Sequence, residues 1–294
     1  MKYHLVALFT IFVWGITFVS TKVLLVDISP LWILLLRFAL GLCILCVMRP
    51  HVLRLKERTD EVLFAAAGAT GIAAYYLLVF TTATAVGVIV AASPLFTALI
   101  SAALGDRSSI NTRFFCGFAL AMAGLIVVGA GTMGEGDIVN FTGFDLFGDM
   151  LALTAALMWA VYSTLVSRIA QKGYETIAAT KRTFVWGVAF ILVITLIFDP
   201  YAPQPSALLD WQNVLNLLFL GAVASAACFV TWGVAVKHLG ATTTTTYIYL
   251  VPAITATASI LILGEPLNAP IILGLAMTIA GLLLSQKRKR TTGT

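Results

Sequence analysis

One basic residue, Arg37, interrupts the apolar stretch LWILLLRFALGL at residues 31–42. A charge among apolar side chains in lipid is costly unless it is paired, reaches the membrane interface or faces water. A guanidinium in this position has two chemical uses. It can attract a carboxylate to a substrate path, or it can anchor its helix by snorkelling or by bonding to carbonyl groups at a helix end. The residue type and its position leave both interpretations open.

Polar and aromatic side chains form a stripe along the segment that precedes Arg37. Thr10, Trp14, Thr17 and Thr21 recur at i, i+4, i+7 and i+11, so they share one helical face. Such a face points either to a neighbouring helix, where threonine packs well, or to a substrate cavity. The bulk of Trp14 near the middle of the segment favours the cavity, because tryptophan is a poor residue for close helix packing.

Further side chains of the same kinds complete the predicted substrate site. Aromatic walls bind apolar groups and the faces of organic cations, and hydroxyls can fix an amino or a carboxyl group. We therefore predict a cavity for an amphiphilic zwitterion such as an amino acid. Besides Arg37, its predicted lining is Trp14, Thr17, Tyr75, Tyr76, Ser93, Trp159, Tyr162, Arg182, Trp232, Thr246 and Tyr249.

The sequence lacks the residues that other kinds of chemistry would need. The sequence holds no HExxH, GxSxG or Walker A motif, and GAGTMG at 129–134 ends an apolar segment with no strand before it, unlike a dinucleotide fingerprint. The middle of the apolar segments holds no Asp, Glu or His, so an intramembrane enzyme would lack its acid or base. We expect no enzyme activity, no metal and no cofactor. Exchange or facilitated diffusion is as consistent with the sequence as proton antiport.

Composition requires that these residues lie in a membrane. The chain has 294 residues, of which 60% are hydrophobic and 11% charged, and its mean hydropathy is +1.00. Soluble domains carry roughly 25% charged residues. The apolar runs are long enough to cross the hydrocarbon core as helices. The sequence predicts an all-α membrane protein with ten transmembrane helices, at residues 5–25, 30–48, 61–80, 83–104, 112–131, 146–167, 179–198, 212–235, 241–263 and 270–286.

The distribution of Lys and Arg predicts the orientation, because basic loops stay on the cytoplasmic side. With both termini in the cytoplasm, the inner loops hold the basic cluster RPHVLRLKER at 49–58 and the KRKR of 287–290. The outer loops then hold acidic residues and no Lys or Arg. This rule explains the net charge of +5, which therefore gives no reason to expect a nucleic-acid partner. We expect a multi-pass protein of a plasma membrane of the bacterial inner-membrane type.

The two halves of the chain resemble each other. ALFTIFVWGITFVSTKVLL begins at Ala7 and ALTAALMWAVYSTLVSRIA at Ala152, an offset that aligns Trp14 with Trp159 and Arg37 with Arg182. Residues 1–134 and 145–290 are thus predicted to be two repeats of five spans each. Because five is odd, the second repeat would enter the membrane from the opposite side. Such inverted repeats are typical of secondary carriers, whose substrate sites lie near the midplane between the halves.

Small residues and prolines predict how the helices meet. Gly117, Gly124 and Gly131 recur every seven residues in the fifth span, as do Gly274 and Gly281 in the tenth, which predicts close helix packing. Pro94 and Pro252 fall within the fourth and ninth spans and are expected to kink them in mid-helix.

Several segments resemble the two EamA domains of the drug/metabolite transporter superfamily. They are GDMLALTAALMWAVYSTLVSR (148–168), LRF (36–38), ASPLFTALISAALGDR (92–107) and HLGATTTTTYIYLVPAITATASILILGEPL (238–267). The resemblance implies ten helices in two inverted five-helix repeats, with spans 1, 3, 4, 6, 8 and 9 around a cavity and spans 5 and 10 outside. It also implies carrier-type movement, often export, of small metabolites such as amino acids. In the first half the glutamate expected after the fourth span is replaced by Asp106, whereas the second half has Glu265.

Together these observations favour a secondary carrier, an exporter or exchanger that moves small metabolites across the plasma membrane by alternating access. The alternative is a channel or a membrane scaffold without transport activity. We expect a small-molecule substrate, the lipid bilayer as surroundings, and a monomer or homodimer.

Overall fold

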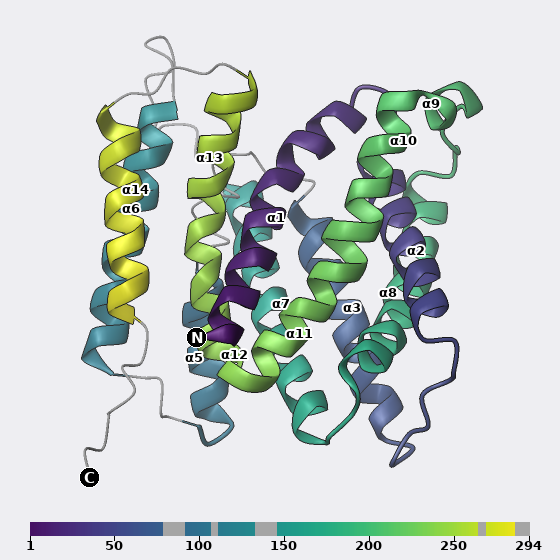
Figure 1. Ribbon diagram of the computed structural model, residues 1–294, viewed down its shortest axis with the longest axis horizontal. Helices are drawn as coiled ribbons and strands as arrows, with labels where there is room; N and C mark the ends of the chain where they lie inside the picture. Colours follow the sequence, from purple (N-terminus) through teal and green to yellow (C-terminus); the bar gives the residue numbers. More distant parts are fainter. Residues whose placement is uncertain (79–91, 107–110, 133–145, 264–268, 286–294) are drawn as a thin grey trace.

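The computed structural model describes residues 1–78, 92–106, 111–132, 146–263 and 269–285, and within these ranges the chain forms helices and no strand (Figure 1). Expected spans that the structure describes as single helices are α1 (Lys2–Leu24), α2 (Pro30–Met48), α3 (Asp60–Leu78), α6 (Thr112–Thr132), α7 (Leu146–Gln171), α8 (Thr176–Phe198) and α14 (Ala269–Ser285). Of the fourth span, residues 83–91 lie outside the described residues, and the remainder is α5 (Ser93–Ala103). A short helix that the sequence did not predict, α9 (Pro205–Leu209), lies in the connection after α8.

The eighth and ninth spans are each built from three pieces. The eighth runs through α10 (Trp211–Leu218), a π-helix η1 (Phe219–Ala227) and α11 (Cys228–Leu239). The ninth runs through α12 (Ala241–Thr246), a 3₁₀ turn η2 (Tyr247–Tyr249) and α13 (Leu250–Leu263). A π-helix closes its hydrogen bonds one residue further on than an α-helix, so η1 changes the register of the side chains that follow it.

Pro94 and Pro252, which the sequence predicts to kink the fourth and ninth spans, each lie near the start of a described helix. Pro94 is in the first turn of α5, after Ala92 at the N-cap. Pro252 is the third residue of α13, directly after the 3₁₀ turn. The residues directly before Ala92 lie outside the described residues. In the ninth span, the 3₁₀ turn directly before α13 interrupts the regular α-helix next to Pro252, which has no N–H to donate to a helical carbonyl.

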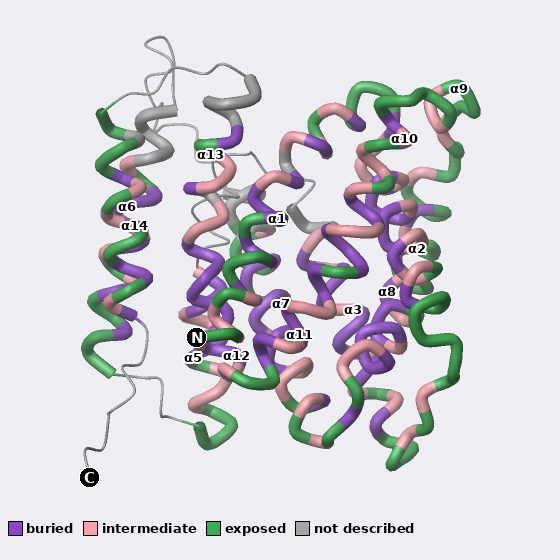
Figure 2. Tube along the Cα trace, in the orientation of Figure 1, coloured by how far each residue is buried: buried purple, intermediate pink, exposed green. Residues whose placement is uncertain are grey.

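Length and apolar composition identify five of the described helical segments as able to cross a membrane: Lys2–Leu24, Pro30–Met48, Leu153–Gln171, Thr176–Phe198 and Trp211–Leu239. Figure 2 shows exposed residues along the described helices, and many of the exposed side chains are large and apolar. Examples are Phe12 on α1, Val193 and Ile197 on α8, and Leu283 on α14. Soluble proteins rarely expose so much contiguous apolar surface, so the chain is a multi-pass membrane protein.

Helices α6 and α14 form a closely packed pair at one side of the bundle (Figure 1). A Cβ atom added at Gly281 would lie 2.5 Å from the backbone nitrogen of Ala121, and one at Gly117 would lie 2.5 Å from that of Ser285. These glycines therefore let the two backbones touch, which confirms the close packing predicted from Gly117 and Gly281.

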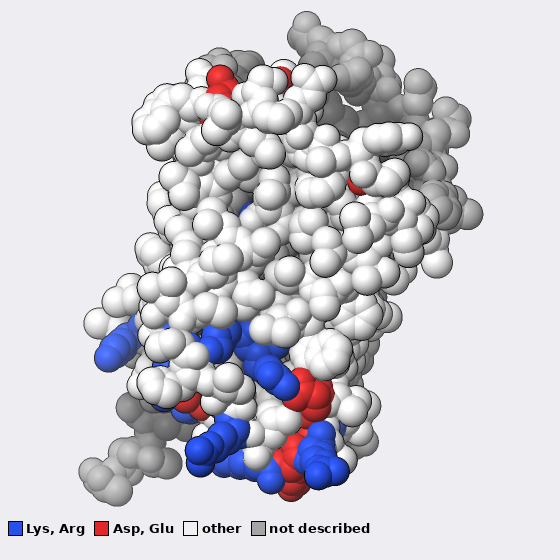
Figure 3. All heavy atoms as spheres, turned by 90° about the vertical axis from the view of Figure 1, so that its right-hand side faces the viewer, with Lys and Arg blue, Asp and Glu red and all other residues white. Residues whose placement is uncertain are grey.

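Charged residues divide between the two ends of the bundle. Lys and Arg gather at the lower end in Figure 3, which we call the basic end. There Lys181 Nζ donates to the carbonyls of Arg49, at 2.5 Å, and His51, at 2.9 Å, and so caps the C-terminus of α2. At the opposite end, Asn213 Nδ2 donates to Asp27 Oδ2 at 2.9 Å and connects the eighth span to the turn after α1.

The basic end also holds a buried carboxylate, Asp60, which connects the α2–α3 turn to the α7–α8 turn. Lys172 Nζ lies 2.5 Å from Asp60 Oδ1, and the Tyr174 hydroxyl donates to Asp60 Oδ2. The same hydroxyl accepts from the backbone N–H of Lys56 at 2.8 Å. Hydrogen bonds from Lys172, then from Tyr174, lower the pKa of Asp60, and those to Asp60 and Glu57 raise the pKa of Lys172.

Substituting Gly281→Val should separate α6 from α14. The added methyl groups would occupy the space of the Ala121 backbone, and we expect a loss of about 1–3 kcal/mol in the free energy of unfolding in detergent. Ala280→Val is the matched control, because Ala280 is exposed on the same helix and the same β-branched residue meets no neighbour there. Equal stability of the two variants would contradict the packing described here.

Asp60→Asn should lower the melting temperature of the purified protein over a defined pH range. Asp60 contributes stability above the ordinary pKa of a carboxyl, and this contribution is lost as pH falls through its lowered pKa in the folded protein. Lys172 contributes stability below the ordinary pKa of lysine, and this contribution is lost as pH rises through its raised pKa in the folded protein. The difference from the unsubstituted protein should thus be constant from about pH 5 to about pH 9 and shrink below about pH 4.

The control for this measurement is Glu175→Gln, which removes the exposed ion pair of Glu175 with Arg49 at the same end. Exposed pairs contribute little, so its melting temperature should stay close to that of the unsubstituted protein. If Asp60→Asn behaves like Glu175→Gln at neutral pH, the buried contact does not stabilise the fold.

Candidate functional site

Three tryptophans from three helices meet inside the bundle. Trp14 of α1 lies 5.3 Å from Trp159 of α7 and 5.2 Å from Trp232 of α11, and the latter two lie 5.6 Å apart, measured between ring centroids. All three are nearly or fully buried. We call these residues the tryptophan triad. The repeat had predicted that Trp14 and Trp159 occupy corresponding positions, and the structure brings the two side chains into contact.

Phe229 of α11 joins the triad to a second group of rings. Its ring centroid lies 5.5 Å from that of Trp14 and 6.1 Å from that of Trp159. On its other side it lies 5.9 Å from Tyr162 of α7 and 6.2 Å from Tyr75 of α3. The aromatic cluster, as we use the term below, consists of Trp14, Trp159, Trp232, Phe229, Tyr162, Tyr75, Phe38 and Phe184.

Hydrogen bonding differs among the members of the triad. Trp14 Nε1 donates to the carbonyl of Ala224 in η1, at 2.9 Å. The indole nitrogens of Trp159 and Trp232 are buried and have no hydrogen-bond partner among the described residues. An unsatisfied buried donor costs about 1–3 kcal/mol. The triad therefore holds two N–H groups whose bonding capacity is unused by the described part of the chain.

Arg37 lies on α2 beside the aromatic cluster, and its side chain is only 5% exposed. Nε donates to Ser225 Oγ of η1 at 3.1 Å. The guanidinium carbon lies 5.3 Å from the ring centroid of Tyr75 and 5.5 Å from that of Phe38. No carboxylate among the described residues pairs with it. Cation–π contact therefore provides part of the stabilisation of this charge. The other N–H groups of the guanidinium bond to no carboxylate among the described residues.

Arg182, at the corresponding position of the second half, has different surroundings. Its Nε and one terminal nitrogen donate to the two carboxylate oxygens of Glu61 at 2.9 and 2.6 Å, a bidentate pair near the basic end. Trp186 Nε1 donates to the same carboxylate at 2.5 Å. The structure does not bring Arg182 into the aromatic cluster, and its charge is already neutralised by a partner.

The remaining predicted site residues are dispersed. Thr17 and Thr246 bond through their hydroxyls to backbone carbonyls of their own segments, at 2.6 and 2.8 Å. Tyr249 is buried and faces Phe118 of α6, at 6.4 Å between ring centroids. Ser93 is buried at the start of α5. The side chain of Tyr76 lies outside the described residues.

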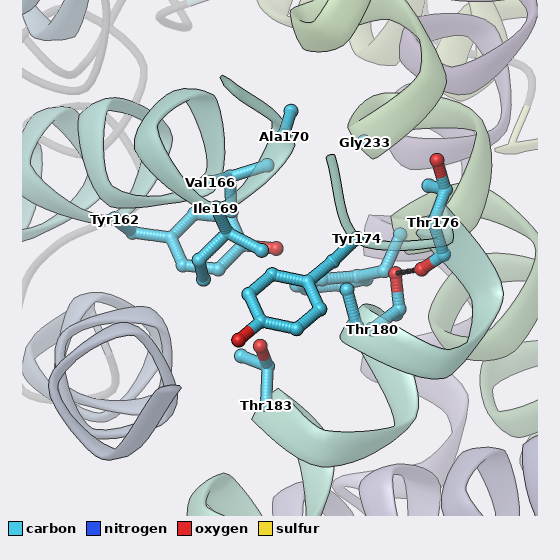
Figure 4. A pocket seen from close by; sticks show the side chains of 11 residues that line it. Tyr162, Val166, Ile169, Ala170, Tyr174, Thr176, Thr180, Thr183 and Gly233 are labelled. Atoms are coloured by element: carbon cyan, nitrogen blue, oxygen red, sulfur yellow. Dashed lines mark hydrogen bonds between the residues drawn. The ribbon is translucent and has the colours of Figure 1, made fainter. Parts of the chain in front are cut away.

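A pocket lies between α7, α8 and α11 on the side of the aromatic cluster that faces the basic end (Figure 4). Tyr162 and Phe229 are in its wall, and Tyr174, which bonds to Asp60, is in its wall toward the basic end. In Figure 4 the rings of Tyr162 and Tyr174 both extend into the space, with Thr183 beside them. A second, smaller pocket shares Tyr162, Phe229 and Thr183 and is otherwise lined by α2, α3 and α8. Tyr162 and Phe229 therefore separate both pockets from the triad.

Phe229, Phe38 and Phe184 were not among the predicted site residues. Phe229 precedes Trp232 by three residues, a spacing that puts both on one face of α11, so helical periodicity could have identified it. The bond between Arg37 and Ser225 had no such signal, because the π-helix that presents Ser225 does not follow from the sequence pattern. Phe38 directly follows Arg37, and Phe184 follows Arg182 by two residues.

The chain is similar along its whole length to proteins that are named as transporters. It is 26% identical over 298 residues to an "Uncharacterized transporter" of Archaeoglobus fulgidus, covering 98% of each chain. It is 27% identical to a "Probable amino-acid metabolite efflux pump" of Escherichia coli, covering 97% of this chain and 94% of that protein. It is also 27% identical to a "Probable terminal-alkyne amino-acid exporter" of Streptantibioticus cattleyicolor, covering 81% and 77%.

The fold is also found among solved structures. One crystal structure superposes on this chain with a TM-score of 0.77, covering 97% of this chain and 96% of the other at 19% sequence identity. At that identity the likeness establishes the arrangement of the helices. The sequence model of the EamA-like transporter family matches residues 1–130 and again residues 146–286. The chain, with its buried aromatic cluster between many apolar helices, belongs to the EamA-like transporter family.

Proposed function

We propose that this protein is a secondary carrier that exports or exchanges small metabolites, amino acids among them, across a plasma membrane by alternating access. The observation that carries the proposal is the aromatic cluster with the buried Arg37 beside it. Rings from both halves of the chain converge there, and groups that could bind a ligand lie at the same place. The names of the Escherichia coli and Streptantibioticus cattleyicolor relatives, which refer to amino acids, support this choice of substrate class.

Helix packing supports the proposed two-fold relation between the halves. α1 packs against α11 and α13 of the second half, and its counterpart α7 packs against α3 and α5 of the first. Corresponding helices also pair with each other, α2 with α8 and α6 with α14. Ten spans in two inverted five-helix repeats would generate this pattern, because an inverted repeat relates the halves by an axis in the membrane plane.

A substrate route follows from the two pockets. A molecule that enters the larger pocket from the basic end reaches Tyr162 and Phe229, whose rings lie 5.9 Å apart in front of the triad. Those rings would have to separate for the molecule to advance. A site closed by packed side chains suits a carrier, which opens to one side at a time, better than the alternative of an open channel. In this proposal the basic end is cytoplasmic, as the positive-inside rule requires.

The decisive experiment is counterflow with purified protein in liposomes. Vesicles loaded with a mixture of unlabelled amino acids should accumulate a labelled one transiently and with saturation, because a carrier exchanges substrates across the membrane. Liposomes without protein are the control for leakage. Flux that rises linearly with concentration and shows no counterflow would identify a channel, and no flux with any amino acid or other metabolite tested would favour a scaffold.

Orientation can be tested with single cysteines in a background from which Cys43, Cys46, Cys116 and Cys228 have been removed. Tyr201, in the connection after α8, is 86% exposed, and Val52, in the α2–α3 turn, is 76% exposed. We expect Tyr201→Cys to react with a membrane-impermeant thiol reagent in intact cells. Val52→Cys should react only after permeabilisation. The reverse pattern would contradict the proposed orientation.

A further inference from the structure

The aromatic cluster contains hydrogen-bond donors without partners and no described acid to balance them. The indole N–H groups of Trp159 and Trp232 have no hydrogen-bond partner among the described residues, although both side chains are more than nine-tenths buried. Among the described residues, the guanidinium of Arg37 uses one of its five N–H groups, on Ser225. A ligand that complements these groups must supply acceptors, and a carboxylate supplies about four acceptor positions together with the missing negative charge.

Described acids lie at the two ends of the bundle and are engaged there. At the basic end, Asp60 and Glu57 pair with Lys172, and Glu61 and Glu175 pair with arginines. At the other end, Asp210 caps α10, Asp27 accepts a hydrogen bond from Asn213, and Asp199 accepts one from Ser29. Asp106 is exposed and follows α5. None of these carboxylates is in contact with the aromatic cluster.

An amino group on the ligand would find a poor environment in the same cluster. An ammonium needs acceptors and a negative counter-charge, and the cluster's described polar groups offer only uncharged hydroxyls. Ring faces can attract a cation, but Arg37 already stands over two of them, Tyr75 and Phe38. Tyr75 also contacts Trp159, at 5.9 Å between ring centroids, so the guanidinium over Tyr75 is close to the triad. It would repel an ammonium bound within the cluster.

We propose that the site recognises the carboxylate and the apolar body of its substrate and leaves an amino group unrecognised, so that monocarboxylates with an aromatic or branched apolar group are ligands in their own right. Arg37 is the counter-ion, the indole N–H groups of Trp159 and Trp232 are neutral donors, and the rings of Tyr75 and Phe229 hold the apolar body. This inference rests on the proposed transport function and specifies the substrate class of the same site.

Three probes that share one ring and chain separate the contributions of the charges: phenylpropionate, phenylalanine and phenethylamine. Binding to the purified protein is measured by calorimetry and by quenching of tryptophan fluorescence. Binding is preferred to flux because the neutral forms of the acid and the amine cross lipid unaided. We expect phenylpropionate to bind at least as tightly as phenylalanine, and phenethylamine to bind at least about tenfold more weakly. This ranking needs no variant, so it stands whether or not a substitution impairs folding.

Variants of Arg37 then test the counter-ion. Arg37→Gln should weaken phenylpropionate and phenylalanine by at least about tenfold and leave phenethylamine as weak as before, whereas Arg37→Lys should retain part of the affinity for both carboxylates. A reduction of all three ligands to the same extent would point to a structural role for Arg37 and overturn its assignment as counter-ion.

The indole donors are tested by Trp159→Phe and Trp232→Phe, which keep an aromatic ring and remove the N–H group. Each should weaken phenylpropionate binding and should lower the melting temperature of the ligand-free protein less than Trp14→Phe does, because all three lose ring volume but only Trp14 also loses a hydrogen bond. Trp14→Phe is the contrast, since its N–H bonds to Ala224 and its loss should lower that temperature. Affinity unchanged in both variants would remove the indoles from the carboxylate site.

Other outcomes separate this inference from the transport function. If phenethylamine binds as tightly as phenylpropionate, or if none of the three probes binds, the proposed selectivity is wrong. Counterflow of an amino acid in the liposome experiment would still establish a carrier in that case. Absence of any counterflow together with tight binding of phenylpropionate would instead contradict the carrier and retain the carboxylate site.

Discussion

A guanidinium held away from water at the side of an aromatic cluster is the constraint on which the arrangement of the surrounding helices depends. Arg37 needs a hydrogen-bond acceptor, which Ser225 of η1 supplies, and ring faces, which Tyr75 and Phe38 supply. These contacts fix α2 against the middle of the eighth span and against α3. Because the apolar surroundings offer no water to replace these contacts, any displacement of one partner exposes a charge to hydrocarbon.

The π-helix η1 bonds to two neighbouring helices at one level of the bundle. Its residues 224 and 225 present a carbonyl to Trp14 and a hydroxyl to Arg37, so that adjacent positions bond to two different helices, α1 and α2. A regular α-helix has its backbone carbonyls bonded to the N–H four residues on, whereas a π segment loosens that pattern and is frequent at functional sites. The same segment changes the register before α11, the helix that carries Phe229 and Trp232.

Sequence periodicity predicted most of the helices, because lipid requires long apolar helices. Duplication predicted that Trp14 and Trp159 occupy corresponding positions, and the structure adds that their rings are in contact. Periodicity and duplication predicted less of the site. Arg37 and Arg182 align, yet Glu61 neutralises only the second, and a carboxylate near the end of another span cannot be assigned to either arginine from spacing alone. Trp14 is 7% exposed and packs against three rings and a carbonyl, so that it lines a substrate cavity stays a prediction. Whether a buried tryptophan faces a space or other rings depends on helix rotation, which no sequence pattern specifies.

The contacts between helices are of two kinds: those that are rigid and those that can separate. Where backbones touch, little can move: a Cβ at Gly68 of α3 would lie 2.6 Å from the carbonyl of Thr183 in α8, and one at Gly41 of α2 would lie 3.2 Å from that of Gly221 in η1. Between α1, α7 and α11 the contact is made by rings, each pair of which contributes only about 0.5–1.5 kcal/mol beyond its buried area. A side-chain contact can be exchanged for a ligand contact of similar energy, whereas a backbone contact cannot. The aromatic cluster is therefore the part of the interior at which binding a substrate and changing the arrangement of the helices can be the same event.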